Sequence, residues 1–264
     1  QYRTHMNNPY IGITGFTHAD QVRLMLDTFQ RNKRMGSQRR VHIGVVMSFN
    51  TLHGLPSRYT DSFPKNTAIR DIFPAGPQSE IMNCVHYADH SHDPNLRYPL
   101  QNAIGFGGPH MNALQLDAVW PDPDEIQEAL AGHEHITDVI LQVGKHAFEK
   151  VGDEIPRLLS ELARYLDVVT HVLLDKSMGK GIPLDVDDLL PYLRAIHNNL
   201  PDFQLVVAGG LGPNTLHLLE PIIEEFPDIN IDAEGKLRAS GKNVDPLDIP
   251  ITQDYLAKAL RLLK

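Results

Sequence analysis

The sequence predicts an α/β protein whose fold is a single (β/α)8 TIM barrel. Short apolar runs alternate with longer amphipathic runs from near the first residue to the last, and this pattern occurs eight times. The short runs are almost continuously apolar, which is typical of parallel strands buried on both faces. A length of 264 residues also suits one such barrel. We therefore expect one domain over residues 1–264, with residues 1–9 as an N-terminal extension.

Eight apolar runs have the length of strands. They cover residues 10–16, 40–49, 83–89, 113–120, 136–144, 171–177, 203–210 and 229–235. Each is followed by a predicted helix, and such crossovers are what parallel pairing requires. The predicted helices cover residues 18–30, 66–73, 95–106, 122–132, 153–166, 185–200, 214–226 and 251–264. An open doubly wound sheet is the alternative, but the first strand–helix turn lacks the glycine pattern of a dinucleotide site.

The helices differ in how clearly the sequence marks them. In the first, Val22, Met25 and Phe29 belong to an apolar stripe. The second is short and follows a long loop with Pro and Gly, and the third is poorly defined. The fourth opens with acidic residues, which suit a helix N-terminus. The fifth, residues 153–166, has the clearest helical pattern in the chain.

Composition excludes several classes of protein. The formal net charge of −9 argues against a nucleic-acid surface, which needs a stripe of Lys and Arg. The one basic run, residues 31–40, lies between a predicted helix and a strand, so we interpret it as a solvated connection. No apolar run is long enough to span a membrane, and no signal sequence opens the chain. With a single cysteine, we expect a soluble cytoplasmic protein that binds neither nucleic acid nor membrane.

Polar residues at the carboxyl ends of the strands are the candidate site residues, because chemistry in such barrels lies at that end. Asp175 ends the apolar run "HVLL", where an unpaired carboxylate is costly, so we expect it to be paired, protonated or used in catalysis. The alternative is that it only caps its loop. Gly209 and Gly210 end the seventh strand before a predicted helix, which indicates either an anion site or simple turn residues.

Several short motifs resemble those of phosphoribosylanthranilate isomerase, a barrel enzyme of tryptophan biosynthesis. They occur in the family's order: "GIT" at 12–14, "PSRY" at 56–59, "LQL" at 114–116, "LLD" followed by "GKG" at 173–181, and "AGGLGPNT" at 208–215. The resemblance implies an isomerase that performs an Amadori rearrangement by acid/base catalysis, without a metal or an organic cofactor. It implies a phosphorylated small-molecule substrate.

The resemblance also implies roles for individual residues. Asp175 matches the general acid, Arg58 a substrate-binding arginine, and Gly209 and Gly210 the phosphate-binding loop. Asp232 resembles a substrate-binding aspartate if its strand is shifted by one or two residues. The remaining candidates lie at strand ends: Gln115 for substrate binding, and Glu234 with Gly235 for phosphate binding.

The chain departs from the family at two places. The family has a cysteine, its general base, directly before "GIT", and this chain has Ile11 there. Another base is therefore needed, and His86, Asp117 and Asp89 are the candidates at strand ends. Glu234 would repel a phosphate unless Lys236 or Arg238 intervenes or the acid is protonated. The single cysteine, Cys84, is expected to lie deep in the barrel as a core residue.

Two other functions remain open. The chain could be a barrel that has lost its proton-transfer pair and binds a small anionic metabolite without catalysis. It could also be a metal-dependent aldolase or hydrolase that uses "HYADHSHD" at residues 86–93, although a polar loop with exposed histidines is the favoured interpretation and no metal ligand is assigned. Exposed apolar residues on the outer helices could support a homodimer.

Overall fold

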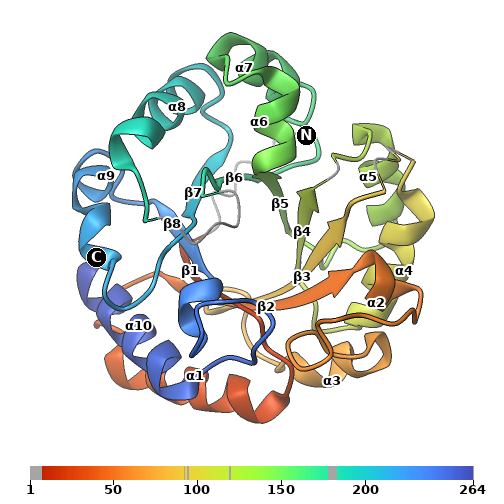
Figure 1. Ribbon diagram of the computed structural model, residues 1–264, viewed down its shortest axis with the longest axis vertical. Helices are drawn as coiled ribbons and strands as arrows, with labels where there is room; N and C mark the ends of the chain where they lie inside the picture. Colours follow the sequence, from red (N-terminus) through yellow and green to blue (C-terminus); the bar gives the residue numbers. More distant parts are fainter. Residues whose placement is uncertain (1–7, 92, 94, 119, 178–182, 264) are drawn as a thin grey trace.

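Eight parallel strands close into a barrel in the order β1 to β8, which confirms the fold class (Figure 1). The computed structural model describes residues 8–91, 93, 95–118, 120–177 and 183–263. Most of the expected extension at residues 1–9 therefore lies outside the described residues. The strands are β1 (Tyr10–Thr14), β2 (Arg40–Ser48), β3 (Ile81–Asp89), β4 (Ala113–Ala118), β5 (Asp138–Val143), β6 (His171–Leu174), β7 (Gln204–Ala208) and β8 (Asn230–Ala233).

Helices surround the barrel (Figure 1). They are α1 (Ala19–Asn32), α2 (Phe49–Leu52), α3 (Ile69–Ile72), α4 (Arg97–Gly107), α5 (Pro123–Leu130), α6 (Lys145–Val151), α7 (Ile155–Ala163), α8 (Val186–Asn199), α9 (Glu220–Glu225) and α10 (Ile249–Leu262). Short 3-10 helices are η1 (Asn66–Ala68), η2 (Leu216–Leu219) and η3 (Gly235–Leu237). Among the described residues, none of these helices combines the length and the apolar character of a membrane-crossing segment.

Side-chain caps fix where several helices begin. Asp122 accepts a hydrogen bond from the backbone of Asp124 at the start of α5, and Asp248 accepts one from Ile251 at the start of α10. Such caps satisfy backbone N–H groups that have no partner inside the helix. The sequence did not predict α6, which is short and ends at Gly152 in the left-handed conformation.

Alternation along each strand separates two apolar clusters. One cluster fills the barrel interior, and the other packs between the sheet and the helices. The interior cluster consists of Tyr10, Met82, Cys84, Ala113, Ile140, Leu173, Val206 and Ala208. Cys84 is fully buried in it, as expected. A barrel interior of this kind is a packed core and not a pore.

The amino-terminal half of the barrel interior contains a buried ion pair. The Arg40 guanidinium donates to both carboxylate oxygens of Asp138, at 2.9 and 3.0 Å, with both side chains almost fully buried. Tyr10 stacks on His42 with the ring centroids 5.0 Å apart and also contacts His171. The interpretation of residues 31–40 as a solvated connection is therefore wrong for its last residues, because inward alternation at the start of β2 takes Arg40 into the barrel.

Candidate functional site

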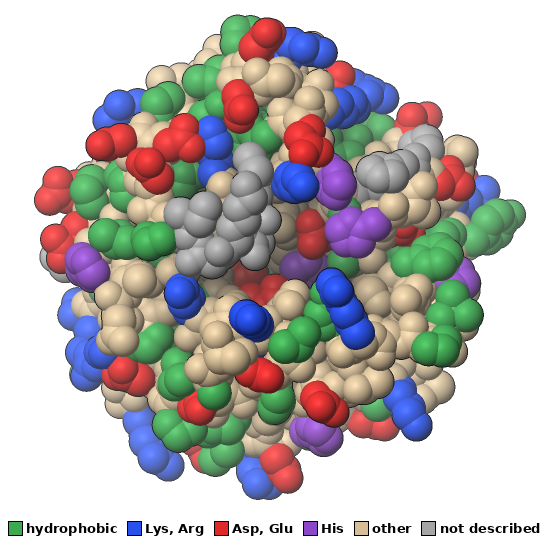
Figure 2. Space-filling model, viewed as in Figure 1, with side chains coloured by type: hydrophobic (Ala, Val, Ile, Leu, Met, Phe, Trp, Pro, Cys, Tyr) green, Lys and Arg blue, Asp and Glu red, His purple; other side chains and the backbone are tan. Residues whose placement is uncertain are grey.

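The candidate site is a cavity of about 650 Å³ at the carboxyl ends of the strands. Figure 2 shows a hollow at the centre of this face, with acidic side chains inside it and Lys and Arg side chains around it. The expected site residues that line the cavity are Arg58, His86, Gln115, Asp175, Gly209, Gly210, Asp232, Glu234 and Gly235. Asp117 does not line it but lies 3.2 Å from His86.

Asp175 follows β6 and packs against Gly209, the first residue after β7. Its Oδ1 accepts hydrogen bonds from the backbone N of Ser177 at 3.0 Å and from the Ser177 hydroxyl at 2.6 Å. A Cβ at Gly209 would lie 2.6 Å from the same oxygen, and Gly209 also has a φ of +99°. Burial raises the pKa of Asp175 even though the bonds from Ser177 favour its charged form. Asp175 therefore caps its own loop and faces the cavity.

Asp232 lies at the end of β8, beside β1. Thr14 on β1 donates a hydrogen bond to its carboxylate, with Oγ1 at 3.0 Å from each oxygen. Position 12 on β1 is glycine, and a Cβ there would lie 2.5 Å from Oδ1 of Asp232. Burial raises the pKa of Asp232 to about 7, although the His86 charge and the Thr14 bond act in the opposite direction. This carboxyl group is thus placed to exchange a proton near neutral pH.

His86 on β3 and Asp117 on β4 form an ion pair, with Nε2 and Oδ2 3.2 Å apart. Burial disfavours the charged imidazole, but the hydrogen bond and the charge of Asp117 outweigh it and raise the pKa of His86. Burial likewise opposes the charged form of Asp117, and the bond from His86 still lowers the pKa of that carboxyl. Both partners are therefore stabilised in their charged forms.

Gln115 lies beside His86 in the sheet and is almost fully buried. Its side-chain N donates to Oε1 of Gln142 at 2.9 Å. Gln142, on β5, also lines the cavity. The pair gives the floor of the cavity a polar surface at the level of the carboxylates.

Glu234 pairs with Arg238 and not with Lys236 in the described part of the chain. The Arg238 Nη2 lies 3.4 Å from Oε1 of Glu234, and the Arg238 side chain is fully buried. Its Nη1 donates to the carbonyl oxygen of Asp245. A phosphate beside Glu234 requires a neighbouring cation that offsets the carboxylate charge. Arg238 is that cation.

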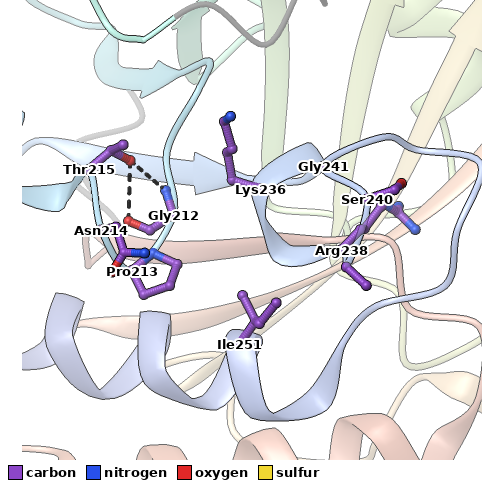
Figure 3. Close-up of a pocket in the computed structure, with 10 residues that line it drawn as sticks. Gly212, Pro213, Asn214, Thr215, Lys236, Arg238, Ser240, Gly241 and Ile251 are labelled. Atoms are coloured by element: carbon purple, nitrogen blue, oxygen red, sulfur yellow. Dashed lines mark hydrogen bonds between the residues drawn. The ribbon is translucent and has the colours of Figure 1, made fainter.

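Gly209 and Gly210 both have positive φ angles, +99° and +66°. The loop after them is fixed by Thr215, whose hydroxyl donates to the Gly210 carbonyl at 2.8 Å and accepts from Gly212 N at 2.9 Å. Figure 3 shows Thr215 beside Gly212, with Lys236 opposite them. A second cavity of about 350 Å³ lies here and shares Lys236 with the main cavity.

Arg58 reaches the cavity from the loop between α2 and η1. Its guanidinium lies over the Tyr59 ring, 4.8 Å from the centroid, and its Nη2 donates to the Tyr59 hydroxyl at 2.6 Å. The Tyr59 ring in turn stacks on Phe63. Arg58 is exposed, so it stands at the entrance and not on the floor.

Ile11 packs outside the barrel, so the residue that replaces the family's cysteine does not face the cavity. It belongs to the apolar cluster between sheet and helices. The hypothetical Cβ at Gly12 meets Asp232, which shows that position 12 faces inward and position 11 outward. On β1, therefore, the position that matches the family's catalytic cysteine faces the helices and not the cavity.

Of the two candidates in the segment 86–93, His86 lines the cavity and Asp89 does not. The carboxylate of Asp89 accepts from the Tyr87 hydroxyl at 2.6 Å and from the backbone of Ser91, and Asp89 does not line the cavity. His92 lies outside the described residues. Across the described part of the chain, no three His, Cys, Asp or Glu side chains are grouped to hold a metal ion.

Some residues of the site were not among those expected. Ser177, Gln142 and Tyr59 line the cavity. Gln142 could have been found, since it is the one polar residue at an inward position of the run "VILQV". The "GKG" of residues 179–181 lies outside the described residues.

Comparison with known proteins supports the fold. No protein family and no curated protein matches the sequence. The structure is similar to 3-hexulose-6-phosphate synthase from Salmonella typhimurium, with a TM-score of 0.55, 12% identity, and coverage of 97% of this chain and 98% of that one. It is also similar to phosphonopyruvate hydrolase, with a TM-score of 0.50, 14% identity, and coverage of 86% and 75%. At such identities the likeness shows a shared barrel fold.

Proposed function

We propose that this protein is an enzyme that rearranges a phosphorylated sugar, or its amine adduct, by acid/base catalysis in the cavity at the carboxyl ends of the strands. The observation that carries the proposal is that the half-buried Asp175 and the buried Asp232, both with a raised pKa, line the same cavity. Enzymes tune carboxyl groups in this way so that they can donate or accept protons near neutral pH.

Asp175 is the general acid in this proposal. A carboxyl group with a raised pKa keeps its proton at a pH where ordinary aspartates have lost it. Ser177 fixes the orientation of the carboxyl group through Oδ1, which leaves Oδ2 for the substrate. Protonation of the ring oxygen of a sugar by Asp175 would break the bond from that oxygen to carbon and open the ring.

The His86–Asp117 pair acts as a charged donor. Because Asp117 favours the charged form of the His86 imidazole and raises its pKa, this ring suits an oxygen that gains negative charge. Its Nδ1 has no hydrogen-bond partner among the described residues. We therefore propose that His86 binds a substrate oxygen and that Asp117 holds its ring in place.

The phosphate would lie at the β7–β8 side of the cavity. Gly209, Gly210 and Gly235 bring backbone close to the cavity there, Arg238 neutralises Glu234, and Lys236 supplies a positive charge. Barrel enzymes frequently bind phosphate at the loops after strands 7 and 8. The name of one structural neighbour, 3-hexulose-6-phosphate synthase, also points to a sugar phosphate, as does the resemblance to phosphoribosylanthranilate isomerase.

The proposal is tested by binding and by proton exchange. Ribose 5-phosphate and inorganic phosphate should raise the melting temperature of the protein with increasing concentration. Phosphoribosylanthranilate turnover, and exchange of carbon-bound hydrogen of sugar phosphates in D2O followed by 1H NMR, should be detectable and should fall about 100-fold or more in Asp175→Asn.

Asp254→Asn is the matched control, because Asp254 is a half-exposed carboxylate on the outer helix α10, paired only with Lys258 among the described residues. This variant should catalyse hydrogen exchange in sugar phosphates at the wild-type rate. Binding without any exchange or turnover would favour a barrel that only binds an anionic metabolite. If the wild-type protein shows no binding and no hydrogen exchange, the proposed function is overturned.

A further inference from the structure

The group that removes the carbon-bound proton cannot come from the position where the resemblance places it. Ile11 faces the helices, and the inward positions of β1 beside it are Gly12 and Thr14. The proposed rearrangement still needs a second proton-transfer group, a base within reach of the substrate carbon next to the one that loses the ring oxygen. The base must therefore lie on another strand that lines the cavity.

Several carboxyl and imidazole groups near the cavity are already engaged. His86 and Asp117 are paired with each other. Glu234 is paired with Arg238. Asp89 is bonded to the Tyr87 hydroxyl and does not line the cavity. Among the described carboxylates that line the cavity, Asp232 is the one apart from Asp175 that no arginine, lysine or histidine binds within hydrogen-bond distance.

The position of Asp232 suits a base. Its strand, β8, and the strand before Asp175, β6, lie on either side of β7. Neighbouring strands are about 4.8 Å apart, so the two residues stand about 10 Å apart at the backbone, which leaves room for the reacting carbon and oxygen of a sugar. Gly12 provides the space for the Asp232 carboxylate, and Thr14 orients it.

We propose that Asp232 is the general base of this reaction, supplied by β8 in place of a β1 cysteine, and that Thr14 is its positioning residue. The inference rests on the proposed function. Asp175 gives its proton to the ring oxygen as the carbon–oxygen bond breaks. Ring opening leaves a C=N or C=O double bond at the carbon that lost the ring oxygen. Asp232 takes the proton from the neighbouring carbon, the electron pair of that C–H bond forms the carbon–carbon double bond of the enolamine or enol, and the C=N or C=O pair returns to nitrogen or oxygen. The first carbon then takes a proton from Asp232 while the enol hydroxyl gives its proton back to Asp175, so the isomerisation needs no oxidant or reductant.

The groups that face Asp232 come from several strands. Thr14 lies on β1, His42 on β2 with Nδ1 4.0 Å from Oδ1, and His86 on β3. Glu234 follows Asp232 on its own chain segment and raises its pKa, whereas the charge of His86 lowers it. Burial lowers the pKa of His42 to about 3, so His42 is neutral and does not pin Asp232 in its charged form. A base with a pKa near the working pH both accepts and returns a proton readily.

The test measures phosphoribosylanthranilate turnover and hydrogen exchange against pH in the wild type, Asp232→Asn, Asp232→Glu and Thr14→Val, with ribose 5-phosphate binding as a second readout. Asp232→Asn should lose about 100-fold or more of the rate while it still binds ribose 5-phosphate. Asp232→Glu should recover part of the rate. Thr14→Val removes a donor that favours the carboxylate, so the acidic limb of its rate profile should move to higher pH.

The outcomes separate this inference from the proposed function. An active wild type with an equally active Asp232→Asn overturns the inference alone. An inactive wild type overturns both. If Asp232→Asn does not fold, Thr14→Val decides, because a merely structural Thr14 would lower stability without moving the acidic limb, and an unmoved limb overturns the inference.

Discussion

The carboxylate of Asp175 occupies the space that a side chain at residue 209 would need. A Cβ at Gly209 would lie 2.6 Å from Oδ1 of Asp175. Two consecutive strands of the barrel are thus fitted to each other at their carboxyl ends, and the fit aims one of the two proposed proton-transfer groups at the cavity.

Gly209→Ala should displace Asp175 and reduce the exchange rate of the enzyme by tenfold or more, a rough estimate for a misplaced catalytic group. Gly132→Ala is the control, because Gly132 also has a positive φ, +81°, but has nothing within 4 Å of a hypothetical Cβ. It should lose about 1 kcal/mol of stability from backbone strain and keep full activity. Equal activity of the two variants would contradict this account of Asp175.

Asp232→Asn should change how stability depends on pH. The pKa of Asp232 is raised from an ordinary value of 3.8 to about 7, so the folded chain binds more protons than the unfolded chain between these values. By linkage, the contribution of Asp232 to the free energy of unfolding falls as pH rises through this window, by at most about 4 kcal/mol.

Urea unfolding at pH 4.5 and pH 8 should therefore show that Asp232→Asn gains stability relative to the wild type as the pH rises. The other titrating groups, including Asp175, remain in both proteins, so the difference between them reports residue 232 together with its charge coupling to His86. A constant difference between the two proteins at both pH values would mean that Asp232 titrates in its usual range.

Ile11→Cys should not create a reactive thiol in the cavity. Residue 11 is fully buried in the cluster beneath the helices, and the native Cys84 is also buried, with a pKa raised by burial. Neither thiol should react with a water-soluble disulfide reagent in the folded protein. Ser240→Cys, at an exposed position that lines the cavity, should be labelled rapidly. Rapid labelling of Ile11→Cys would mean that β1 presents its other face to the site.

Asp138→Ala should destabilise the protein strongly, by about 3–5 kcal/mol, because it leaves the Arg40 charge buried without its partner. Glu225→Ala is the control: it removes an equally well-formed pair with Arg194, but on the surface, where solvent screens the charges. Denaturant unfolding should show a large loss for the first variant and little change for the second. A small loss at Asp138 would indicate that water reaches Arg40.

The strands were predictable because their burial on both faces makes the apolar runs nearly continuous, and a polar residue that ends such a run, such as Asp175, stands out. The contact between Asp232 and Thr14 was not predictable in the same way. It joins residues 218 positions apart and exists only because β8 pairs with β1 in a register that places Ile231 beside Ile11 and Asp232 beside Gly12. No local pattern encodes that register.

The sequence also did not reveal which strand residues face the barrel interior and which face the helices. Apolar residues on both sides of a strand hide its phase, so nothing in "YIGITGF" indicated that Ile11 faces the helices. For the same reason the inward orientation of the Arg40 side chain was not predicted. The run of basic residues suggested a solvent-exposed segment instead of a buried ion pair. The short helix α6 was missed because its seven residues give little periodicity to detect.

The stacked rings of Tyr10 and His42, the tilted ring of His171 beside them and the rest of the apolar interior cluster close the barrel below the cavity. In the part of the chain that the structure describes, the cavity therefore has one opening, beside Arg58, and substrate and product must both pass through it. A product still held there blocks the next reactant, so inhibition by product is expected to be competitive.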